Sequence, residues 1–262
     1  MKLIQFTDIH LTIPPKTLYQ QDPNANFAAG LAHCLERHGD ADALVISGDL
    51  TEYGEIETYE RLRTMLADLP MPVALTIGNH DLRENFAVVF AEHLDPSGFA
   101  QSVFALSEGT GIIIDTVNPG SHAGALCATR LAWLREALAG AKPPVFLFMH
   151  HHPLPIHLED IDRVMLADAD AFGDIVETHR EKIAHIFFGH IHLPTFGSVR
   201  GVPASASRGA NQNGYPDYAA HRVRRGAPVA PAYTVVFADR NSVTVQMVEF
   251  GLETRPHIWA PK

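Results

Sequence analysis

Short apolar runs, each broken abruptly by polar side chains, recur along the first three quarters of the chain. They are rich in β-branched and aromatic residues, as is typical of strands that are buried on both faces of a sheet. These runs occupy residues 2–7, 43–47, 73–77, 145–149 and 183–188. The segments between them predict helices, one starting at Asp22 and Pro23 and the others at 56–66, 83–93, 129–140 (with Thr129 as its cap) and 168–180. Strands that alternate with helices predict an α/β fold.

The rest of the chain predicts shorter strands and irregular segments. Two antiparallel pairs are expected, 102–106 with 111–115 and 195–199 with 202–204. An irregular loop is expected at 154–166, as a rim over the strand ends. Residues 205–231, rich in Gly, Pro, Ser and Arg, predict a surface excursion, and 232–250 predict a terminal hairpin. Because the chain has no internal repeat and no clear linker, we expect residues 1–262 to form a single domain.

Composition and charge narrow the class of protein. The 262 residues are 46% hydrophobic, so the chain is long enough to bury a sizeable core. The net charge of −10 disfavours binding to nucleic acid or anionic membranes, but a local site can still attract a small anionic substrate. No run approaches the roughly 18 apolar residues of a membrane span, and none near the start suits a signal peptide. The two cysteines, Cys34 and Cys127, make no disulfide framework, which favours a reducing, cytoplasmic setting.

Metal-binding side chains stand at the ends of all five apolar runs. Each motif alone is weak, but the same kind of residue follows every run, and the chain has 16 histidines, many of them clustered. The candidate ligands are Asp8, His10, Asp49, Asn79, His150, His190 and His192. Because open α/β sheets bind ligands at the carboxyl ends of their strands, we expect these seven side chains to converge.

Strand geometry predicts how neighbouring donors are shared. Residues two apart in an extended segment point to the same side, so Asp8 and His10 can face one ion. By the same spacing, His190 and His192 can straddle a pair of ions, one imidazole to each. In the triplet 150–152 the rings alternate faces, so at most two share a side, and His150 is the predicted ligand because it directly follows the strand.

The donor set predicts the chemistry of the site. Oxygen and imidazole donors without thiolates suit Mn, Fe, Co or Zn, and seven donors are too many for one ion. With Asp49 as a bridge they divide between two divalent or mixed-valence ions, and two carboxylates leave such a core at about +2. A core of this charge attracts a phosphate, and a hydroxide held by the ions can attack phosphorus in line.

Residues beside the ligands have predicted supporting roles. His80 points away from the ions and is the candidate for contacting the phosphate and protonating the leaving alkoxide. Asp81 either holds the imidazole of His80 or caps the next helix. Glu52 is expected to accept a hydrogen bond from a ligand, with a solvated loop charge as the alternative. Asp49 and His80 are thus the predicted catalytic residues, and Asn79 and His80 the predicted substrate contacts.

Five blocks in order resemble the calcineurin-like metallophosphoesterases: Asp8-x-His10, Gly48-Asp49-x-x-Glu52, Gly78-Asn79-His80-Asp81, His150-His151 and Gly189-His190-x-His192. The resemblance covers residues 1 to about 200 and is greatest to bacterial class III cyclic-nucleotide phosphodiesterases and glycerophosphodiesterases. It implies a four-layer α/β/β/α sandwich with two mixed β-sheets. It also implies Asp8, His10, Asp49 and His192 at one ion, Asp49, Asn79, His150 and His190 at the other, and His80 as the catalytic histidine. One departure is that His152 stands between the histidine pair and Pro153.

The resulting functional hypothesis is hydrolysis of a small phosphodiester, either a 3′,5′-cyclic nucleotide such as cyclic AMP or a glycerophosphodiester. The alternatives are a phosphomonoesterase or broad phosphodiesterase on the same ions, and a scaffold protein without activity. Candidate contacts to a base or to glycerol are Tyr19, Phe86, His157, Phe196 and Tyr215. A basic patch of Arg208, Arg222, Arg224 and Arg225 could reach a substrate phosphate, and 205–231 is a candidate homodimer contact.

Overall fold

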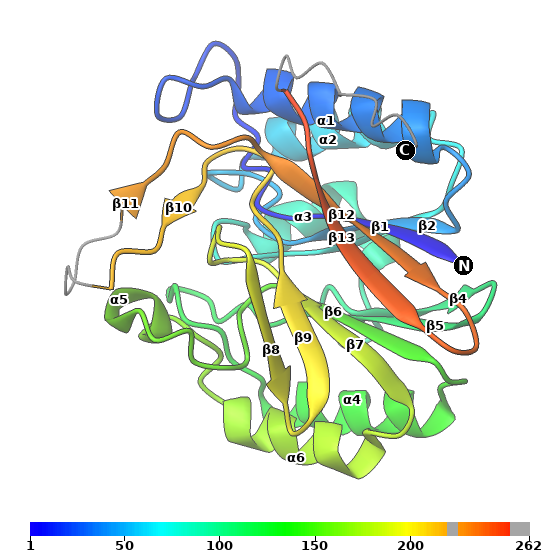
Figure 1. The fold of residues 1–262 in the computed structure, drawn as a ribbon. Coiled ribbons are helices and arrows are strands. Elements are labelled where there is room, and N and C mark those ends of the chain that lie inside the picture. Colours follow the sequence, from blue (N-terminus) through cyan, green and yellow to red (C-terminus); the bar gives the residue numbers. More distant parts are fainter. Residues whose placement is uncertain (219–224, 252–262) are drawn as a thin grey trace, which may run out of the picture.

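Two mixed β-sheets, packed face to face, form the centre of the structure (Figure 1), a computed structural model that describes residues 1–218 and 225–251. The strands of the first sheet are β1 (Lys2–Phe6), β2 (Ala43–Ser47), β3 (Val73–Thr76), β12 (Ala232–Ala238) and β13 (Val243–Glu249). Their spatial order is β13-β12-β1-β2-β3. Strands β1, β2 and β3 are parallel, whereas β12 and β13 are an antiparallel hairpin at the side of β1.

The second sheet has the order β4-β5-β6-β7-β9-β8. Its strands are β4 (Ser102–Leu106), β5 (Gly109–Ile114), β6 (Val145–Met149), β7 (Ile183–Phe188), β8 (Thr195–Val199) and β9 (Val202–Ala206). Strands β5, β6, β7 and β9 are parallel, and β4 and β8 are antiparallel edge strands. A separate two-stranded ribbon, β10 (Gly214–Tyr215) with β11 (Arg225–Gly226), stands outside both sheets at the left of Figure 1.

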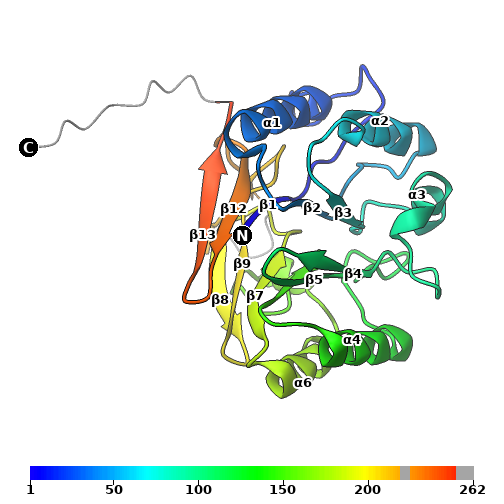
Figure 2. The ribbon, with the colours of Figure 1, turned by 90° about the vertical axis from the view of Figure 1, so that its right-hand side faces the viewer.

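Helices cover the outer face of each sheet and complete four layers, as the turned view shows (Figure 2). The first sheet carries α1 (Pro23–His38), α2 (Ile56–Leu66), α3 (Arg83–Val89) and a 3₁₀ turn, η1 (Ala91–His93). The second carries α4 (Ala128–Gly140) and α6 (Ala169–His179), while α5 (Glu159–Asp162) is a single turn away from the sheets. None of the helices within residues 1–218 and 225–251 has the length and apolar character to cross a membrane. The predicted sandwich with two mixed sheets is confirmed.

Alternation within the strands explains why the apolar runs are continuous. Leu3 and Val45 point into the core between the two sheets, whereas Ile4 and Leu44 point toward α1 and α2. Phe146 likewise faces the core between the sheets, and its neighbours in β6 pack on α4 and α6. Because successive side chains leave a strand on opposite faces and both faces are covered, most positions within these strands are apolar, and the few buried polar ones are paired, as Gln5 is with the hydroxyl of Ser47 at 2.8 Å.

The boundaries of several predicted elements differ from the structure. The predicted helix 83–93 divides into α3 and η1, and the hairpin strand predicted at 111–115 begins earlier, at Gly109. Thr129 does not cap its helix, because α4 starts at Ala128 and its cap position is Cys127. The loop predicted at 154–166 contains the turn α5. Residues 207–213 of the predicted surface excursion include buried positions, so this segment is partly an internal wall.

The two cysteines have opposite environments, which generates a test of the packing. Cys34 lies buried in α1, and burial raises the pKa of its thiol to about 12. Cys127 is exposed at the start of α4, where hydrogen bonds from Arg130 outweigh slight desolvation and lower the pKa of its thiol. Because the thiolate is the nucleophile, we expect iodoacetamide at pH 8 to alkylate Cys127 alone, as measured by peptide mass spectrometry.

Denaturant supplies the control for this prediction. In the unfolded chain both thiols return to ordinary pKa values and both should be alkylated. Labelling of Cys34 in the folded protein at a rate similar to that of Cys127 would contradict the buried position of α1.

Candidate metal centre

The carboxyl ends of parallel strands from both sheets meet at one site. Strands β1, β2 and β3 contribute from the first sheet, and β6 and β7 from the second. The two sets are tied together directly: Nδ1 of His150 lies 3.0 Å from the carbonyl oxygen of Ser47, and the backbone N–H of His190 donates to both oxygens of Asp8 at 3.1 Å. These bonds join loops that are more than a hundred residues apart in the chain.

A first group of donors consists of Asp8, His10, Asp49 and His192, whose potential ligand atoms all lie within 4.8 Å of one another. Nε2 of His192 is 3.2 Å from Oδ1 of Asp8, and Nε2 of His10 is 3.6 Å from Oδ2 of Asp49. The Nε2 atoms of His10 and His192 are 3.2 Å apart. Two imidazoles that share one ion at about 2.0–2.1 Å from each nitrogen have a similar separation.

A second group consists of His150, His151 and His190, again within 4.8 Å. Nε2 of His150 is 3.3 Å from Oδ1 of Asp49, so the two oxygens of this carboxylate face different groups. The amide nitrogen of Asn79 lies 3.0 Å from Nδ1 of His122, which leaves its oxygen without a partner. The structure thus brings six of the seven predicted side chains into the two groups, with Asn79 on the wall of the adjoining cavity, and places His190 and His192 in different groups.

Hydrogen bonds fix which imidazole nitrogens carry lone pairs. Nδ1 of His150 faces a carbonyl oxygen, as does Nδ1 of His192, which is 2.6 Å from the oxygen of Gln212. Nδ1 of His10 faces the carboxylate of Glu52 at 2.8 Å. Since carbonyls and carboxylates only accept, each Nδ1 is the donor, and each neutral ring presents Nε2 as a lone pair toward the donor groups. The predicted supporting role of Glu52 agrees with this contact.

The backbone conformation, not strand geometry, aims these side chains. Five of the seven predicted ligands have left-handed backbone, with φ of 54° at Asp8, 46° at His10, 47° at Asp49, 71° at His190 and 53° at His192. Non-glycine residues rarely adopt this conformation, and it concentrates at functional sites. We expected residues two apart to share a side because the strand would continue through them. That reason is wrong, since each strand ends before the ligands begin.

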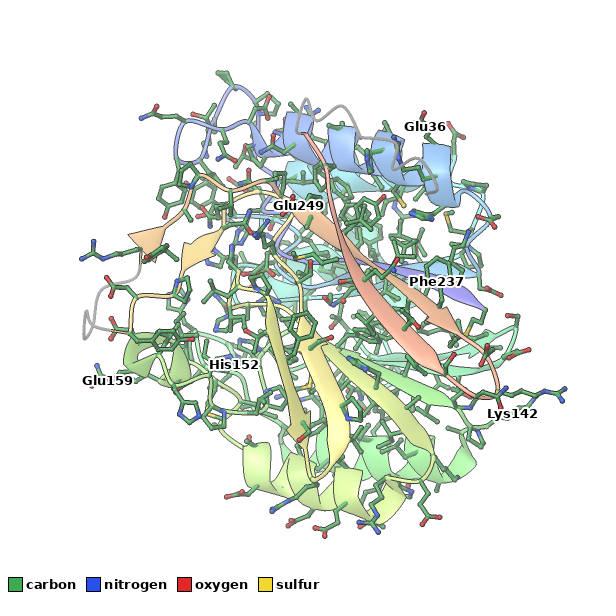
Figure 3. All side chains as sticks on the ribbon, in the orientation of Figure 1. Glu36, Lys142, His152, Glu159, Phe237 and Glu249 are labelled. Carbon is green, nitrogen blue, oxygen red and sulfur yellow. The ribbon has the colours of Figure 1, made fainter. Side chains whose placement is uncertain are left out.

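The histidine triplet departs from strand geometry in the same way. Strand β6 ends at Met149, and the consecutive residues His150 and His151 both enter the second group, which alternation would forbid. His152 is buried and stacks on the ring of His190 with centroids 5.6 Å apart. Its Nε2 lies 3.9 Å from Asp162 in α5. In Figure 3, His152 lies further inside the molecule than Glu159, which is the first residue of α5.

Glycines make room where the loops approach most closely. A Cβ on Gly78 would meet Nε2 of His150 at 2.7 Å and would clash with the carboxylate of Asp49. Gly48, at φ 95°, would place a Cβ 2.5 Å from Nδ1 of His150. The glycines that precede Asp49 and Asn79 are therefore required by the convergence itself.

Unpartnered polar atoms test whether the site suits a metal. Among the described residues, Oδ1 of Asn79 and Nε2 of His150, His151 and His190 are buried without a hydrogen-bond partner. Such orphaned atoms are rare in folded proteins, and here each is a lone pair or can become one. The three imidazoles belong to one group and His150 lies 3.3 Å from Asp49, so a cation there would satisfy unpartnered nitrogens beside a carboxylate. The residues present therefore fit a metal site of oxygen and nitrogen donors.

The electrostatics of the two aspartates agree with this fit. Burial alone would raise the pKa of Asp49, but the charges and hydrogen bonds of the surrounding histidines outweigh it and hold the pKa well below its usual value. For Asp8, burial is likewise outweighed, chiefly by His192. The same pairing raises the pKa of His150 to about 9 against its desolvation, whereas burial among other imidazoles lowers the pKa of His190 well below its usual value. Both carboxylates are ionised at neutral pH.

His80 stands at the edge of the first group, on the cavity wall. Its ring packs edge-on against His10, and its Nδ1 lies 3.1 Å from the carbonyl oxygen of Glu52. This bond leaves Nε2 toward the cavity. The backbone N–H of His80 donates to Asp49 at 3.0 Å, so the loop that carries His80 is held by the shared carboxylate.

Asp81 has neither of its two predicted roles. It does not contact the ring of His80, and the cap position of α3 is Leu82. Instead the buried carboxylate accepts bonds from the backbone N–H groups of Leu50, Thr51 and Gly78 at 2.8–3.1 Å, and from the hydroxyl of Tyr59 at 2.9 Å. It therefore ties the loop after β2 to the loop after β3. Burial and the charge of Asp49 raise its pKa.

Two histidines of the site were missed by sequence reasoning. His122, in the loop after β5, orients the amide of Asn79, and His151 joins the second group while its Nδ1 lies 2.8 Å from the hydroxyl of Thr116. The three consecutive histidines 150–152 could have indicated His151 as a site residue, but the assumption that their rings alternate faces placed it on the opposite side from His150. His122 stands in a turn without any motif, so only the abundance of histidine could have drawn attention to it.

A cavity of about 930 Å³ opens from the donor groups toward β10, β11 and α5. Of the predicted substrate contacts, Tyr19, His157 and Tyr215 line it. Phe86 and Phe196 do not: the first is buried in the core under α3, and the second is exposed on β8. These two predictions are wrong because exposure and core position depend on packing, which the local sequence does not report.

Two of the four arginines of the predicted basic patch lie within the described residues, and both of them form ion pairs. Arg208 pairs with Glu249, and Arg225 pairs with Asp217 at 2.8 Å on the cavity wall. Arg222 and Arg224 lie outside the described residues.

A two-sheet sandwich with carboxylates and imidazoles gathered at its strand ends defines a hydrolytic enzyme of the metal-dependent class. A model of the calcineurin-like phosphoesterase family matches residues 1–194, and the chain belongs to that family, which makes it a hydrolase of phosphoric esters. This agrees with the resemblance seen in the five sequence blocks.

Individual relatives support the same class. Over 255 residues, 95% of this chain and 93% of the relative, it is 34% identical to a protein of Rhodopseudomonas palustris named a probable cyclic nucleotide phosphodiesterase. A cAMP/cGMP dual specificity phosphodiesterase of Mycobacterium tuberculosis is 29% identical over 78% of this chain and 66% of its own length. Purple acid phosphatase from yellow lupin seeds shares the fold at 11% identity with a TM-score of 0.63, over 95% of this chain and 51% of the lupin protein.

The position of Asp81 generates a prediction. Asp81→Asn should place an amide N–H₂ against backbone donors that now share a carboxylate, leaving buried N–H groups unpaired. We expect a loss of about 2–3 kcal/mol in the free energy of unfolding by urea titration. Metal content should also fall, because the loops carrying Asp49 and Asn79 are no longer tied.

Asp68→Asn, on the exposed surface after α2, is the matched control and should change neither quantity. An Asp81→Asn protein with unaltered stability and metal content would show that this carboxylate is dispensable for assembling the site.

Proposed function

We propose that the protein hydrolyses a 3′,5′-cyclic nucleotide, such as cyclic AMP, to the 5′-monoester. The observation that carries the proposal is the pair of donor groups that share Asp49 and open into a cavity large enough for a nucleotide. The names of the relatives from R. palustris and M. tuberculosis support the same substrate class. A glycerophosphodiester is the alternative substrate on the same centre, and a phosphomonoester is the rival class.

We assign the ligands to two ions. Asp8, His10, Asp49 and His192 would hold one, and Asp49, Asn79, His150 and His190 would hold the other. When bound, Fe, Mn, Zn or Co ions would provide a nucleophile at neutral pH and offset the charge of the phosphoryl oxygens. His151 is the third imidazole of the second group, and we assign it a supporting role there.

The chain's own residues then position the ester. The amide of Asn79, oriented by His122, lies beside the phosphate, and Nε2 of His80 contacts a phosphoryl oxygen and donates a proton to the leaving alkoxide. The bond from Nδ1 of His80 to Glu52 keeps the ring in this orientation. In-line displacement needs the nucleophile and the leaving group on opposite sides of phosphorus, so His80 would contact the leaving-group side of the ester.

The cellular setting is proposed from the same residues. Both cysteines are free thiols, which supports a reducing, cytoplasmic compartment. The net charge of −10 supports a small-molecule substrate over nucleic acid or a membrane surface. A homodimer through residues 205–231 stays a prediction.

His80→Ala tests the assignment of the leaving-group acid. Loss of a general acid lowers kcat by roughly 10²–10⁴-fold, while the two donor groups stay intact. We therefore expect metal content, measured by elemental analysis, to be retained and hydrolysis of cyclic AMP to fall by that factor. His179→Ala, a half-buried histidine on α6, is the control and should keep both. Loss of metal in His80→Ala would instead make His80 part of the metal site.

A panel of phosphate esters tests the reaction class. We expect hydrolysis of bis(p-nitrophenyl) phosphate to exceed that of p-nitrophenyl phosphate by at least about tenfold in kcat/KM, because the second ester group can bind in the cavity of about 930 Å³ beside the donor groups. Cyclic AMP should be converted to 5′-AMP. Turnover of the monoester alone would favour the rival class, and turnover of glycerophosphodiesters without cyclic AMP would favour the alternative substrate.

A further inference from the structure

Exposed aromatic rings gather on the wall of the cavity that opens from the donor groups. Of the six tyrosines in the chain, the three that line this cavity are also the three most exposed. Tyr19 is 80% exposed, Tyr218 67% and Tyr215 56%. A single exposed aromatic residue is ordinary, but several that line one concave surface are typical of a ligand site.

The turn that carries Tyr19 has a strained backbone. Leu18 and Gln21 exchange backbone hydrogen bonds at 2.8 and 2.9 Å, which closes a two-residue hairpin turn around Tyr19 and Gln20. Both central residues have left-handed backbone, with φ of 48° and 66°. Asn and Gly are the usual residues in such a turn, and a tyrosine there is an outlier. Because strained residues cluster at ligand sites, the exposure of this ring in the cavity indicates a contact with substrate.

The strand that carries Tyr215 is fixed to the reacting centre. The backbone N–H of Gly214 donates to the oxygen of His192 at 3.0 Å, and Nδ1 of His192 lies 2.6 Å from the oxygen of Gln212. Tyr215 itself pairs with Arg225 in the ribbon of β10 and β11 at the left of Figure 1. The ring therefore stands at a set position relative to a predicted metal ligand, as a substrate contact requires.

The charges on the same wall exclude a second anionic group. Glu159, Asp160 and Asp162 line the cavity from α5, and Asp217 lines it beyond β10. Arg225 is the only lysine or arginine among the described residues that line the cavity, and it pairs with Asp217 at 2.8 Å. A carboxylate or a second phosphate of a substrate would be repelled here, so this part of the cavity suits an uncharged group.

We propose that Tyr19 and Tyr215 form an aromatic subsite for an uncharged flat ring of the substrate, such as a nucleobase. This inference rests on the proposed function and favours a cyclic nucleotide over a glycerophosphodiester. A base that stacks on tyrosine covers exposed aromatic surface, and every base has the ring face that stacking requires. Glycerol has no ring face and would leave both tyrosines uncovered.

Two diesters with the same leaving group test the subsite on the metal-loaded protein: phenyl p-nitrophenyl phosphate and methyl p-nitrophenyl phosphate. The quantity measured is the ratio of their kcat/KM values, phenyl over methyl. Intrinsic reactivity is the same in every protein, so a change in the ratio reports the subsite. Tyr19→Leu and Tyr215→Leu should each lower the ratio by about fivefold or more, through KM for the phenyl ester, because a stacking partner is lost.

Conservative variants separate the ring from its hydroxyl. Tyr19→Phe and Tyr215→Phe keep the ring and should keep the ratio of the wild type. Phe196→Leu, which removes an exposed ring on β8 outside the cavity, should keep it as well. The subsite is overturned if both leucine variants keep the wild-type ratio, or if the phenylalanine variants lower it as much as the leucine variants do.

A third ester, the choline ester of p-nitrophenyl phosphate, distinguishes an uncharged ring from a cation. Aromatic rings beside carboxylates also suit a quaternary ammonium group. A larger loss of kcat/KM for the choline ester than for the phenyl ester in the leucine variants would mean that the wall binds a cation, which overturns the proposal. A larger loss for the phenyl ester supports it.

Separate outcomes distinguish the failure of the proposed function from the failure of the subsite. If the wild type hydrolyses the aryl diesters but not cyclic AMP, the proposed substrate is wrong, and the ratio of the two esters still decides the subsite. If it hydrolyses no diester, binding of adenosine, measured by calorimetry, decides it. A Kd raised about fivefold or more in the double variant Tyr19→Leu/Tyr215→Leu supports the subsite. Equal binding by both proteins, or none by the wild type, overturns it.

Discussion

The buried charge of Asp49 is the constraint on which the rest of the site depends. A carboxylate in a protein interior is tolerated only where neighbouring groups compensate for its lost hydration. Here the backbone N–H of His80 donates to one oxygen, and Nε2 of His150 and Nε2 of His10 face the two oxygens, so a positive charge, on the imidazole or on a bound cation, would complete the compensation. Each compensating group comes from a different strand end, so the loops after β1, β3 and β6 must all converge on the loop after β2.

Convergence of this kind requires local backbone conformations that are unfavourable in isolation. Left-handed residues and close-packed glycines cost free energy, and they persist because the two sheets and their three apolar cores hold the loops in place. Asp81 is a further buried carboxylate, and it acts through backbone N–H groups and not as a predicted metal ligand. The site is thus built as two levels: a polar network that fixes the loops, and the donors that the loops present.

The reaction centre and the substrate cavity come from different parts of the chain. The donors lie within residues 8–192, inside the range that matches the phosphoesterase family. Much of the cavity wall is formed by residues within 212–218 and 225–228, beyond that range. Proteins of one family can therefore keep the same reaction and act on different substrates. The residues of the cavity wall can change without disturbing the buried charges that hold the reaction centre together.

The sequence by itself determined the α/β class and most of the strands and pointed to the seven donors at their ends, because buried strands are recognisable as apolar runs and their ends as abrupt changes to Asp, Asn and His; the four-layer sandwich followed from the resemblance to the phosphoesterase family. It could not determine the role of Asp81, the entry of His151 into the second group or the contact of His122 with Asn79. These depend on left-handed turns and on loops from separate sheets meeting in space. Local pattern reports what a residue packs against within its own element, whereas partners brought from a hundred residues away are decided only by the tertiary structure.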